Sequence, residues 1–284
     1  MNKETSPSLR KHHLSSGKII THAILIFGAF IMIFPFVWMI LTSFKGRAET
    51  LMIPPTFFPK TWDFSNYPEV LRTLPFGNLY VNTLLLMFLR IVCAVVFSSM
   101  AGFAFAKLQF PCKKLLFFIV LTQMMLPTQI FIIPQYQMLS KMGALNSQFA
   151  LLFPGLVSAF GTFFLRQFYM SLPTELMESA MLDGANIGQT FLHIMLPLTK
   201  TAMIALAIFT ALFAYSDMMW PLIVNMQTDK MTLSAGISSL QGQHLTNYPV
   251  LMAGSTLAML PMLVMYIFFQ RQFIEGIALT GMKN

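Results

Sequence analysis

Long apolar stretches alternate with short polar segments along most of the chain. Six stretches are long enough for a membrane-spanning helix, which needs about 20 largely apolar residues because each residue adds about 1.5 Å of rise. Prolines interrupt four of the stretches, and they are tolerated where neighbouring helices satisfy the freed carbonyls. The pattern predicts an all-α integral membrane bundle of six transmembrane helices, at about 19–44, 79–106, 115–134, 148–165, 198–219 and 250–269.

Composition supports the same fold class. Apolar residues make up 56% of the chain and charged residues only 10%, whereas a soluble domain carries roughly 25% charged residues. Such a chain cannot cover a water-facing surface in the usual way, which excludes a disordered chain, a soluble nucleic-acid binder and a disulfide scaffold. We therefore expect membrane lipid, and no nucleic acid, around this protein.

The basic residues predict an orientation. If both termini lie in the cytoplasm, eleven of the 18 Lys and Arg residues face the cytoplasm, six face the other side, and Arg90 lies inside the second span. The positive-inside rule favours this arrangement. Residues 1–18 are polar and lack the apolar region of a cleaved signal peptide. We expect a cytoplasmic tail over 1–18, one membrane domain over 19–284, outer connections at 45–78 and 220–249, and a cytoplasmic loop at about 166–197.

Few ionisable groups fall within the predicted spans. Arg90 lies in the second, Asp217 near the outer end of the fifth, and His22 near the start of the first. Arg90 either snorkels, pairs with a polar group or faces a subunit interface, and a structural role is favoured. This scarcity weighs against a carrier powered by its own ion gradient. Some polar span residues are candidates for a substrate path, or equally for hydrogen bonds between helices: Gln123, Gln129, Tyr215 and Asp217.

Motifs for catalysis are absent from the sequence. The Gly17-Lys18 pair lacks the earlier Gly and the following Ser or Thr of a phosphate-binding loop. The five histidines are dispersed, and Cys93 and Cys112 do not have a metal-binding spacing. We therefore expect no enzyme, and no catalytic residue, cofactor or metal in this chain.

The cytoplasmic loop contains a short helix predicted at 173–183. Pro173 suits a first helical turn, Glu175 suits the positive end of the helix, and Gly184 suits the left-handed position just past its C-terminus. An apolar stripe at i, i+4 spacing runs along this helix, formed by Leu176 with Ala180 and by Met177 with Met181.

A second helix follows in the same loop. Asn186 and Gln189 have the spacing of a capping box, and Pro197 is expected to end this helix at about Leu196. A short capped helix fits either a groove on a partner protein or the lipid headgroup region. The acidic side chains, without a Lys or Arg among them, weigh against an anionic membrane surface.

The same loop resembles a known family. Glu178-Ser179-Ala180, then Gly184, then Ile194-x-Leu196-Pro197 is similar to the cytoplasmic motif of permease subunits from binding-protein-dependent ABC importers. That motif reads Glu-Ala-Ala, three residues, Gly, nine residues, Ile-x-Leu-Pro, and six of its seven fixed positions match. Segments at 33–45, 82–83, 104–111, 165–168 and 269–276 resemble the carbohydrate-uptake branch, and the short outer loops resemble its smaller maltose-type permease.

The resemblance implies a multi-subunit machine in a bacterial or archaeal cytoplasmic (inner) membrane. A homologous permease subunit would complete the pore, two cytoplasmic ATPases would bind and hydrolyse ATP, and an extracytoplasmic solute-binding protein would deliver a carbohydrate. The short helix would be the coupling helix that contacts the ATPase, through Glu175, Glu178, Ser179, Ala180, Asp183, Gly184 and Ala185. Alternatives are the same architecture for a phosphorylated polyol or other small solute, a self-powered carrier or channel, and a scaffold without a pore.

Overall fold

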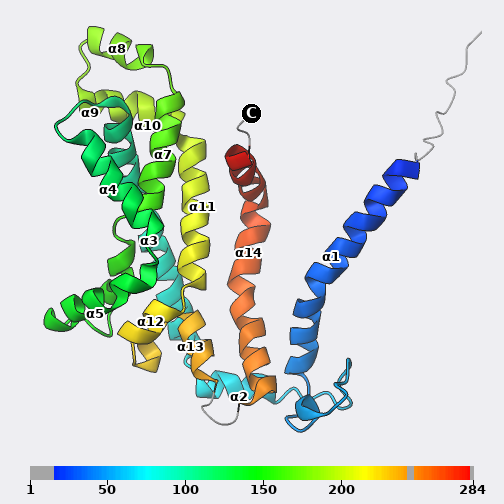
Figure 1. Ribbon diagram of the computed structural model, residues 1–284. Helices are drawn as coiled ribbons and strands as arrows, with labels where there is room; N and C mark the ends of the chain where they lie inside the picture. Colours follow the sequence, from blue (N-terminus) through cyan, green and yellow to red (C-terminus); the bar gives the residue numbers. More distant parts are fainter. Residues whose placement is uncertain (1–15, 242–245, 282–284) are drawn as a thin grey trace, which may run out of the picture.

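The computed structural model of the chain describes residues 16–241 and 246–281, and every regular element within them is helical (Figure 1). Residues 1–15 of the predicted N-terminal tail lie outside the described residues. Three helices are long and apolar enough to cross a membrane: α1 (Ser16–Ser43), α3 (Phe76–Lys107) and α14 (Tyr248–Gly281).

Three further spans are bent pairs of helices, so the chain has up to six spans if each pair counts as one. The angles at the three breaks are 103°, 45° and 74° in chain order. The pairs are α4 (Lys113–Met125) with η2 (Thr128–Phe131) and α5 (Ile132–Lys141); α6 (Gln148–Leu152) and η3 (Phe153–Gly155) with α7 (Ala159–Ser171); and α9 (Ile187–Thr190), η4 (Phe191–Met195) and α10 (Leu196–Leu198) with α11 (Lys200–Ser216).

Shorter elements connect the spans. At the end drawn lowest in Figure 1 lie η1 (Glu49–Leu51), α2 (Asn66–Thr73), α12 (Met219–Val224), η5 (Thr228–Lys230) and α13 (Leu233–Ser239). At the opposite end lies α8 (Glu175–Leu182), together with the first turns of α1 and the last turns of α14.

The third predicted span, 115–134, is not one straight helix. Helix α4 ends at Met125 and Leu126 adopts extended backbone, with φ −86° and ψ 136°. Pro127 explains the break, because it lacks an N–H and disfavours helical backbone in the residue before it. The fourth predicted span is likewise interrupted after Gly155, and Ser158 caps the next helix by accepting a hydrogen bond from the Gly161 N–H.

Three buried clusters hold the main body together, and two of them lie toward its opposite ends. One joins α3, α7 and α11 near α8 and includes Phe103, Leu165 and Leu206; the other joins α2, α3, α13 and α14 near the opposite end. Gly102 lets α3 approach α7 closely, since a Cβ there would lie 2.9 Å from the backbone nitrogen of Arg166. Helices α3 and α7 therefore pack closely where the 166–197 loop begins.

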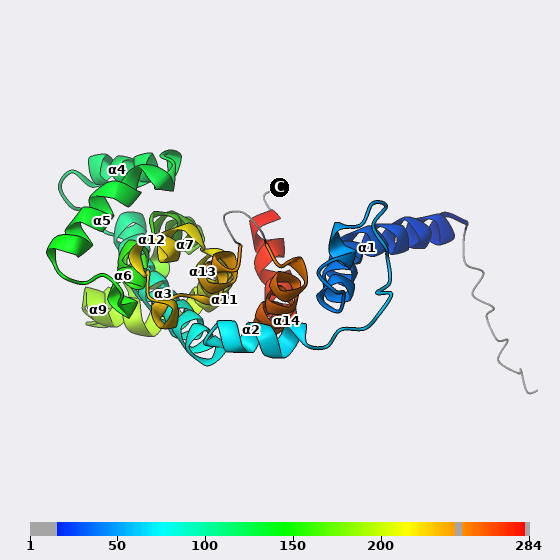
Figure 2. The same cartoon turned by 90° about the horizontal axis from the view of Figure 1, so that it is seen from below.

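The first helix stands apart from this body. No residue of its most apolar 18-residue stretch is buried, and the long helix that it packs against most is α14. In Figure 2, α14 lies between α1 and the remaining helices. Side chains such as Ile26 (68% exposed) and Met32 (75% exposed) therefore face the surroundings of this chain, which in a membrane are lipid or another subunit.

Candidate functional site

A cavity of about 680 Å³ opens beside the helix breaks. Residues from η2, η3 and the interval between α11 and α12 all line it. Non-helical backbone at membrane depth is tolerated only inside protein or along a cavity, and transporters place substrates at such broken helices. Of the predicted path residues, the structure brings Gln129 and Asp217 together here.

Arg90 is the cation of this cavity. Its Nη1 lies 3.0 Å from Asp217 Oδ2, and its Nη2 donates to the Leu151 carbonyl at 2.9 Å. The Arg90 side chain is 11% exposed and that of Asp217 is 24% exposed. The sequence left three roles for Arg90, and the structure shows the one in which it pairs with a polar group. The ion pair offsets the cost of burying a lone charge.

The break in the fourth span supplies a partner for both Arg90 and Trp220. Because Pro154 has no N–H, it leaves the Ala150 carbonyl without its helical donor, and Trp220 Nε1 donates to that carbonyl at 2.9 Å. Arg90 binds the next carbonyl, that of Leu151. Side chains from α3 and α12 thus donate hydrogen bonds to the two carbonyls that the break in the helix leaves free.

Gly155 makes room for this arrangement. A Cβ built on it would lie 2.9 Å from both Cγ and Nε of Arg90, closer than packed carbon atoms come. Any side chain at this position would displace the arginine from its two partners.

Two of the predicted path residues lie elsewhere. The Tyr215 hydroxyl donates to the Ala258 carbonyl and so joins α11 to α14, which matches the alternative of a hydrogen bond between helices. Gln123 is exposed on α4 and does not line this cavity.

The second candidate site is the exposed segment around α8. The helix begins at Glu175, so Pro173 lies before it and not in its first turn as expected, and Asp183 is the C-cap. Gly184 has the predicted left-handed backbone, with φ 85°. The Ala185 N–H donates to the Ala180 carbonyl at 2.9 Å and the Gly184 N–H to the Met181 carbonyl at 3.1 Å, which is the Schellman pattern of helix termination.

The predicted apolar stripe of α8 is divided in the structure. Ala180 is 6% exposed and Met177 packs against the buried cluster of α3, α7 and α11. Leu176 and Met181 are 40% and 39% exposed, and Leu182 is 89% exposed. Each predicted pair therefore has one member against the body and one facing out, so the stripe as predicted is wrong. The candidate docking residues at 175, 178, 179, 183 and 184 are exposed.

The segment after α8 has the predicted capping box. Asn186 and Gln189 exchange backbone-to-side-chain hydrogen bonds of 2.9 Å in both directions. Pro197 does not end the helix, contrary to expectation. It lies in the first turn of α10, where a missing N–H is harmless, and the bend follows at Thr199.

The loop is fastened to the membrane helices. Lys107, the last residue of α3, donates from Nζ to the Leu172 carbonyl at 2.6 Å and to Thr174 Oγ1 at 3.4 Å. Figure 1 places α8 at the extreme end of the molecule, beyond α9 and α10. A force applied to α8 therefore reaches α3 and α7 through short, bonded connections.

Residues 94–278 match the family model described as the inner membrane component of binding-protein-dependent transport systems. The chain belongs to this family. The predicted resemblance is thus confirmed, and the chain is a permease subunit of an ABC importer.

Curated relatives extend the match over nearly the whole permease. It is 34% identical to the arabinooligosaccharides transport system permease protein AraQ of Halalkalibacterium halodurans, over 91% of this chain and 94% of the relative. It is 30% identical to the sn-glycerol-3-phosphate transport system permease protein UgpE of Pectobacterium atrosepticum, over 91% and 95%. It is 28% identical to the diacetylchitobiose uptake system permease protein NgcG of Streptomyces coelicolor, over 91% and 87%. These relatives are named as transport permeases, not as enzymes.

A solved structure shares the fold. A bacterial ABC transporter involved in the import of the acidic polysaccharide alginate contains a chain with a TM-score of 0.75 to this permease. The match covers 93% of this chain and 100% of that one at 21% identity.

Sequence reasoning missed several groups that line the cavity of the permease. Gln135 and Trp220 lie one residue beyond the predicted ends of the third and fifth spans, and Ser158 lies within the fourth. Gln135 and Trp220 each adjoin a proline, Pro134 and Pro221. A polar or amphipathic side chain beside a proline near a span end was the available signal.

Proposed function

We propose that this permease forms half of a carbohydrate translocation pathway and that a separate ATPase drives it through α8. The observation that carries the proposal is that the chain has both a cavity at broken helices and an exposed, capped α8 on which the family motif begins, at Glu178-Ser179-Ala180. The remaining half of the pathway comes from a homologous permease subunit, which covers the exposed face of α1.

The chemistry of the cavity favours a neutral, hydroxyl-rich substrate. Asp217 neutralises Arg90, and the amide side chains of Gln129 and Gln135 supply both donors and acceptors. Two relatives are named for sugar cargo, arabinooligosaccharides and diacetylchitobiose. The second candidate is a phosphorylated polyol, because another relative is named for sn-glycerol 3-phosphate. A phosphate group would require an unpaired cation, and in the described cavity the one cation is paired.

The proposed assembly has two cytoplasmic ATPases that bind ATP and an extracytoplasmic solute-binding protein that delivers the substrate. In this arrangement the chain itself holds no cofactor and catalyses no reaction. We place it as a multi-pass protein of the bacterial or archaeal cytoplasmic membrane with both termini in the cytoplasm. The end that carries α8 also carries the start of α1 and the end of α14, which supports a common side for all three (Figure 1).

ATP binding is coupled to the membrane helices because the ATPase contacts α8 differently in its two states. The ATPase groove would contact Glu175, Glu178 and Asp183 differently when it is closed around ATP and when it is open, and only such a difference transmits energy. The bonds from Lys107 and the packing of Met177 carry the displacement into α3 and α7. These helices border the cavity through Arg90 and the break at Gly155.

Uptake into proteoliposomes tests the proposal. The complete transporter, with its ATPase and binding protein, is expected to accumulate a labelled arabinooligosaccharide or diacetylchitobiose only with ATP on the ATPase side. The same vesicles are expected to ignore sn-glycerol 3-phosphate. The purified subunit alone is expected to accumulate nothing under a proton gradient. Gradient-driven uptake by the lone subunit would favour a carrier, and selective uptake of the phosphorylated solute would favour the second candidate.

A further inference from the structure

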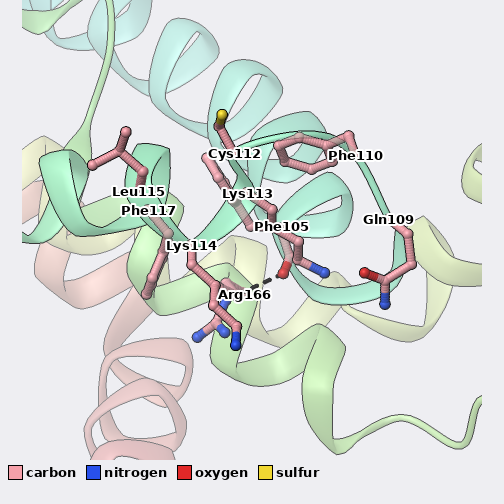
Figure 3. Close-up of a pocket in the computed structure, with 9 residues that line it drawn as sticks. All are labelled: Phe105, Gln109, Phe110, Cys112, Lys113, Lys114, Leu115, Phe117 and Arg166. Atoms are coloured by element: carbon pink, nitrogen blue, oxygen red, sulfur yellow. Dashed lines mark hydrogen bonds between the residues drawn. The ribbon is translucent and has the colours of Figure 1, made fainter.

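A second cavity, of about 720 Å³, lies where α3 connects to α4 beside α7, at the end of the bundle that carries α8 (Figure 3). Three cations line it: Lys113, Lys114 and Arg166. Three aromatic rings line it as well, and they contact one another with centroid distances of 5.6 and 5.4 Å: Phe105, Phe110 and Phe117.

Arg166 is positioned but its charge is not neutralised. Its guanidinium lies over the Phe117 ring at 4.0 Å, and its Nε donates to the Phe105 carbonyl at 3.3 Å. Its two terminal nitrogens make no hydrogen bond to the described part of the chain. Figure 3 shows the guanidinium beside Lys114, with the dashed bond running to Phe105.

The two lysines are also without an acidic partner. Lys113 Nζ donates one hydrogen bond, to the Leu108 carbonyl at 2.6 Å. Among the side chains that the structure describes, no carboxylate oxygen lies within 4.0 Å of the charged nitrogens of Lys113, Lys114 or Arg166, so none balances this cavity. Three clustered cations repel one another unless an anion lies among them, and guanidinium and ammonium groups are the usual ligands of phosphate oxygens.

The surface next to the cavity indicates where the phosphate comes from. Leu115 belongs to the cavity wall, and α4 continues from it with an exposed apolar face: Leu115 (59% exposed), Phe118 (65%) and Ile119 (56%). A free phosphate ion makes no use of aromatic rings or of an apolar helix face. A phospholipid uses both, because its acyl chains lie along apolar helix surfaces while basic pockets between membrane helices hold its headgroup.

We propose that this cavity binds the headgroup phosphate of an anionic phospholipid, with Lys113, Lys114 and Arg166 around the phosphate and the acyl chains along Leu115, Phe118 and Ile119. The lipid completes the charge balance at the junction of α3, α4 and α7. Gly102 brings α7 against α3 at this level, so the bound lipid stabilises the part of the bundle that carries the 166–197 loop.

The test is native mass spectrometry of the complete transporter, titrated with phosphatidylglycerol in phosphatidylcholine. The variant is Lys113→Gln with Lys114→Gln, and the matched control is Lys18→Gln with Lys200→Gln, which removes two exposed lysines from the same end but outside the cavity. We expect the apparent affinity for one phosphatidylglycerol to fall about fivefold for each cavity lysine removed, while the control retains it. Arg166→Lys keeps the charge and is expected to retain most of the binding.

Two outcomes overturn the proposal. An equal loss in variant and control would mean general attraction to an anionic surface and no site. Displacement of phosphatidylglycerol by inorganic phosphate, added in a parallel titration, would mean that the cavity takes the free ion. The measurement counts bound lipid and does not depend on uptake, so its failure is distinct from failure of the proposed transport function.

Discussion

Arg90 of α3 and Asp217, just past the end of α11, are joined by an ion pair with 3.0 Å between Nη1 and Oδ2. The arginine also holds the Leu151 carbonyl at the break of the fourth span. One side chain thus ties together three segments that are far apart in sequence. In a bundle of broken helices, such a tie fixes how the pieces lie around the cavity.

Asp217→Asn is expected to destabilise the permease by about 3 kcal/mol, because it leaves Arg90 buried without a counter-charge. This is the lower end of the range for buried pairs, since the Asp217 side chain is 24% exposed. The matched control is Asp229→Asn, whose pair with Lys230 is 4.0 Å long and about half exposed, so it should cost less than about 1 kcal/mol. Thermal unfolding of the complete transporter measures both. Equal shifts in the two variants would contradict a structural role for the Arg90 pair.

Gly155→Ala is expected to act through the same arginine and to cost about 1–3 kcal/mol, as overpacking does. The added Cβ would lie 2.9 Å from Arg90 Nε. Gly77→Ala is the control, since a Cβ there meets nothing within 4 Å. In an Arg90→Ala background the effect of Gly155→Ala should largely disappear, and a double-mutant cycle on unfolding midpoints tests this. Independent, additive effects would show that Gly155 matters for some other reason.

The apolar stretches were predictable because helix length and hydropathy are local properties. The positions at which the helices break were less predictable from the sequence. Pro35 and Pro261 remain inside α1 and α14, whereas Pro127 and Pro154 accompany breaks in the helix. The outcome at Pro154 depends on Trp220, which is 70 residues from the carbonyl it satisfies. A single sequence does not show such distant partners.

The candidate sites divide in the same way. The cap at Gly184 and the capping box of Asn186 and Gln189 were predictable, because each involves neighbours within six residues. Asp217 and Tyr215 were equal candidates for the substrate path from sequence. The structure separates them because the Tyr215 hydroxyl finds a carbonyl on α14, a helix whose position beside α11 is a tertiary property.

Acidification is expected to loosen the segment between α1 and α2. Burial alone would raise the pKa of Glu49, but hydrogen bonds from Thr56 Oγ1 and the Lys60 N–H, with the charges of Lys45 and Lys60, outweigh it and hold the pKa below its ordinary value. A depressed pKa gives stability that is present above the unfolded value of about 4.3 and is lost as the pH falls through the folded value. The protection factors of the amides over 45–60, which are corrected for the intrinsic pH dependence of exchange, should therefore fall below about pH 4, and Glu49→Gln should remove that fall.

Single cysteines test the proposed orientation. In a background without Cys93 and Cys112, cysteines at Ile53 and Gln227 should react with a membrane-impermeant reagent added to intact cells, because both sites are exposed at the end opposite α8. A cysteine at Gly188 should react only after permeabilisation. Its Cβ would meet Asn186 Oδ1 at 3.4 Å, an ordinary contact, so the substitution is tolerated. Labelling of the Gly188 site from outside would reverse the orientation.

The docking role of α8 leads to the most direct prediction for function. Gly184→Val places a β-branched side chain in a left-handed conformation, at a cost of roughly 1–2 kcal/mol, although a Cβ there meets no other atom of this chain. Glu178→Lys reverses an exposed charge of α8. Both variants should insert normally and retain the permease partner. Both should lose ATPase co-purification, or hydrolyse ATP without uptake.

Two controls separate the causes. Gly184→Asn tolerates the left-handed backbone but adds bulk at the docking face, so a loss as large as that of Gly184→Val points to contact with the ATPase and not to strain. Glu69→Lys reverses an exposed charge on α2, at the opposite end of the molecule, and should leave ATPase binding unchanged. The readouts are uptake, co-purified ATPase and stimulated ATP turnover, each normalised to membrane level. A helix that merely lies on lipid headgroups predicts that uptake and ATPase binding survive both Gly184→Val and Glu178→Lys, and that result would remove the coupling role from α8.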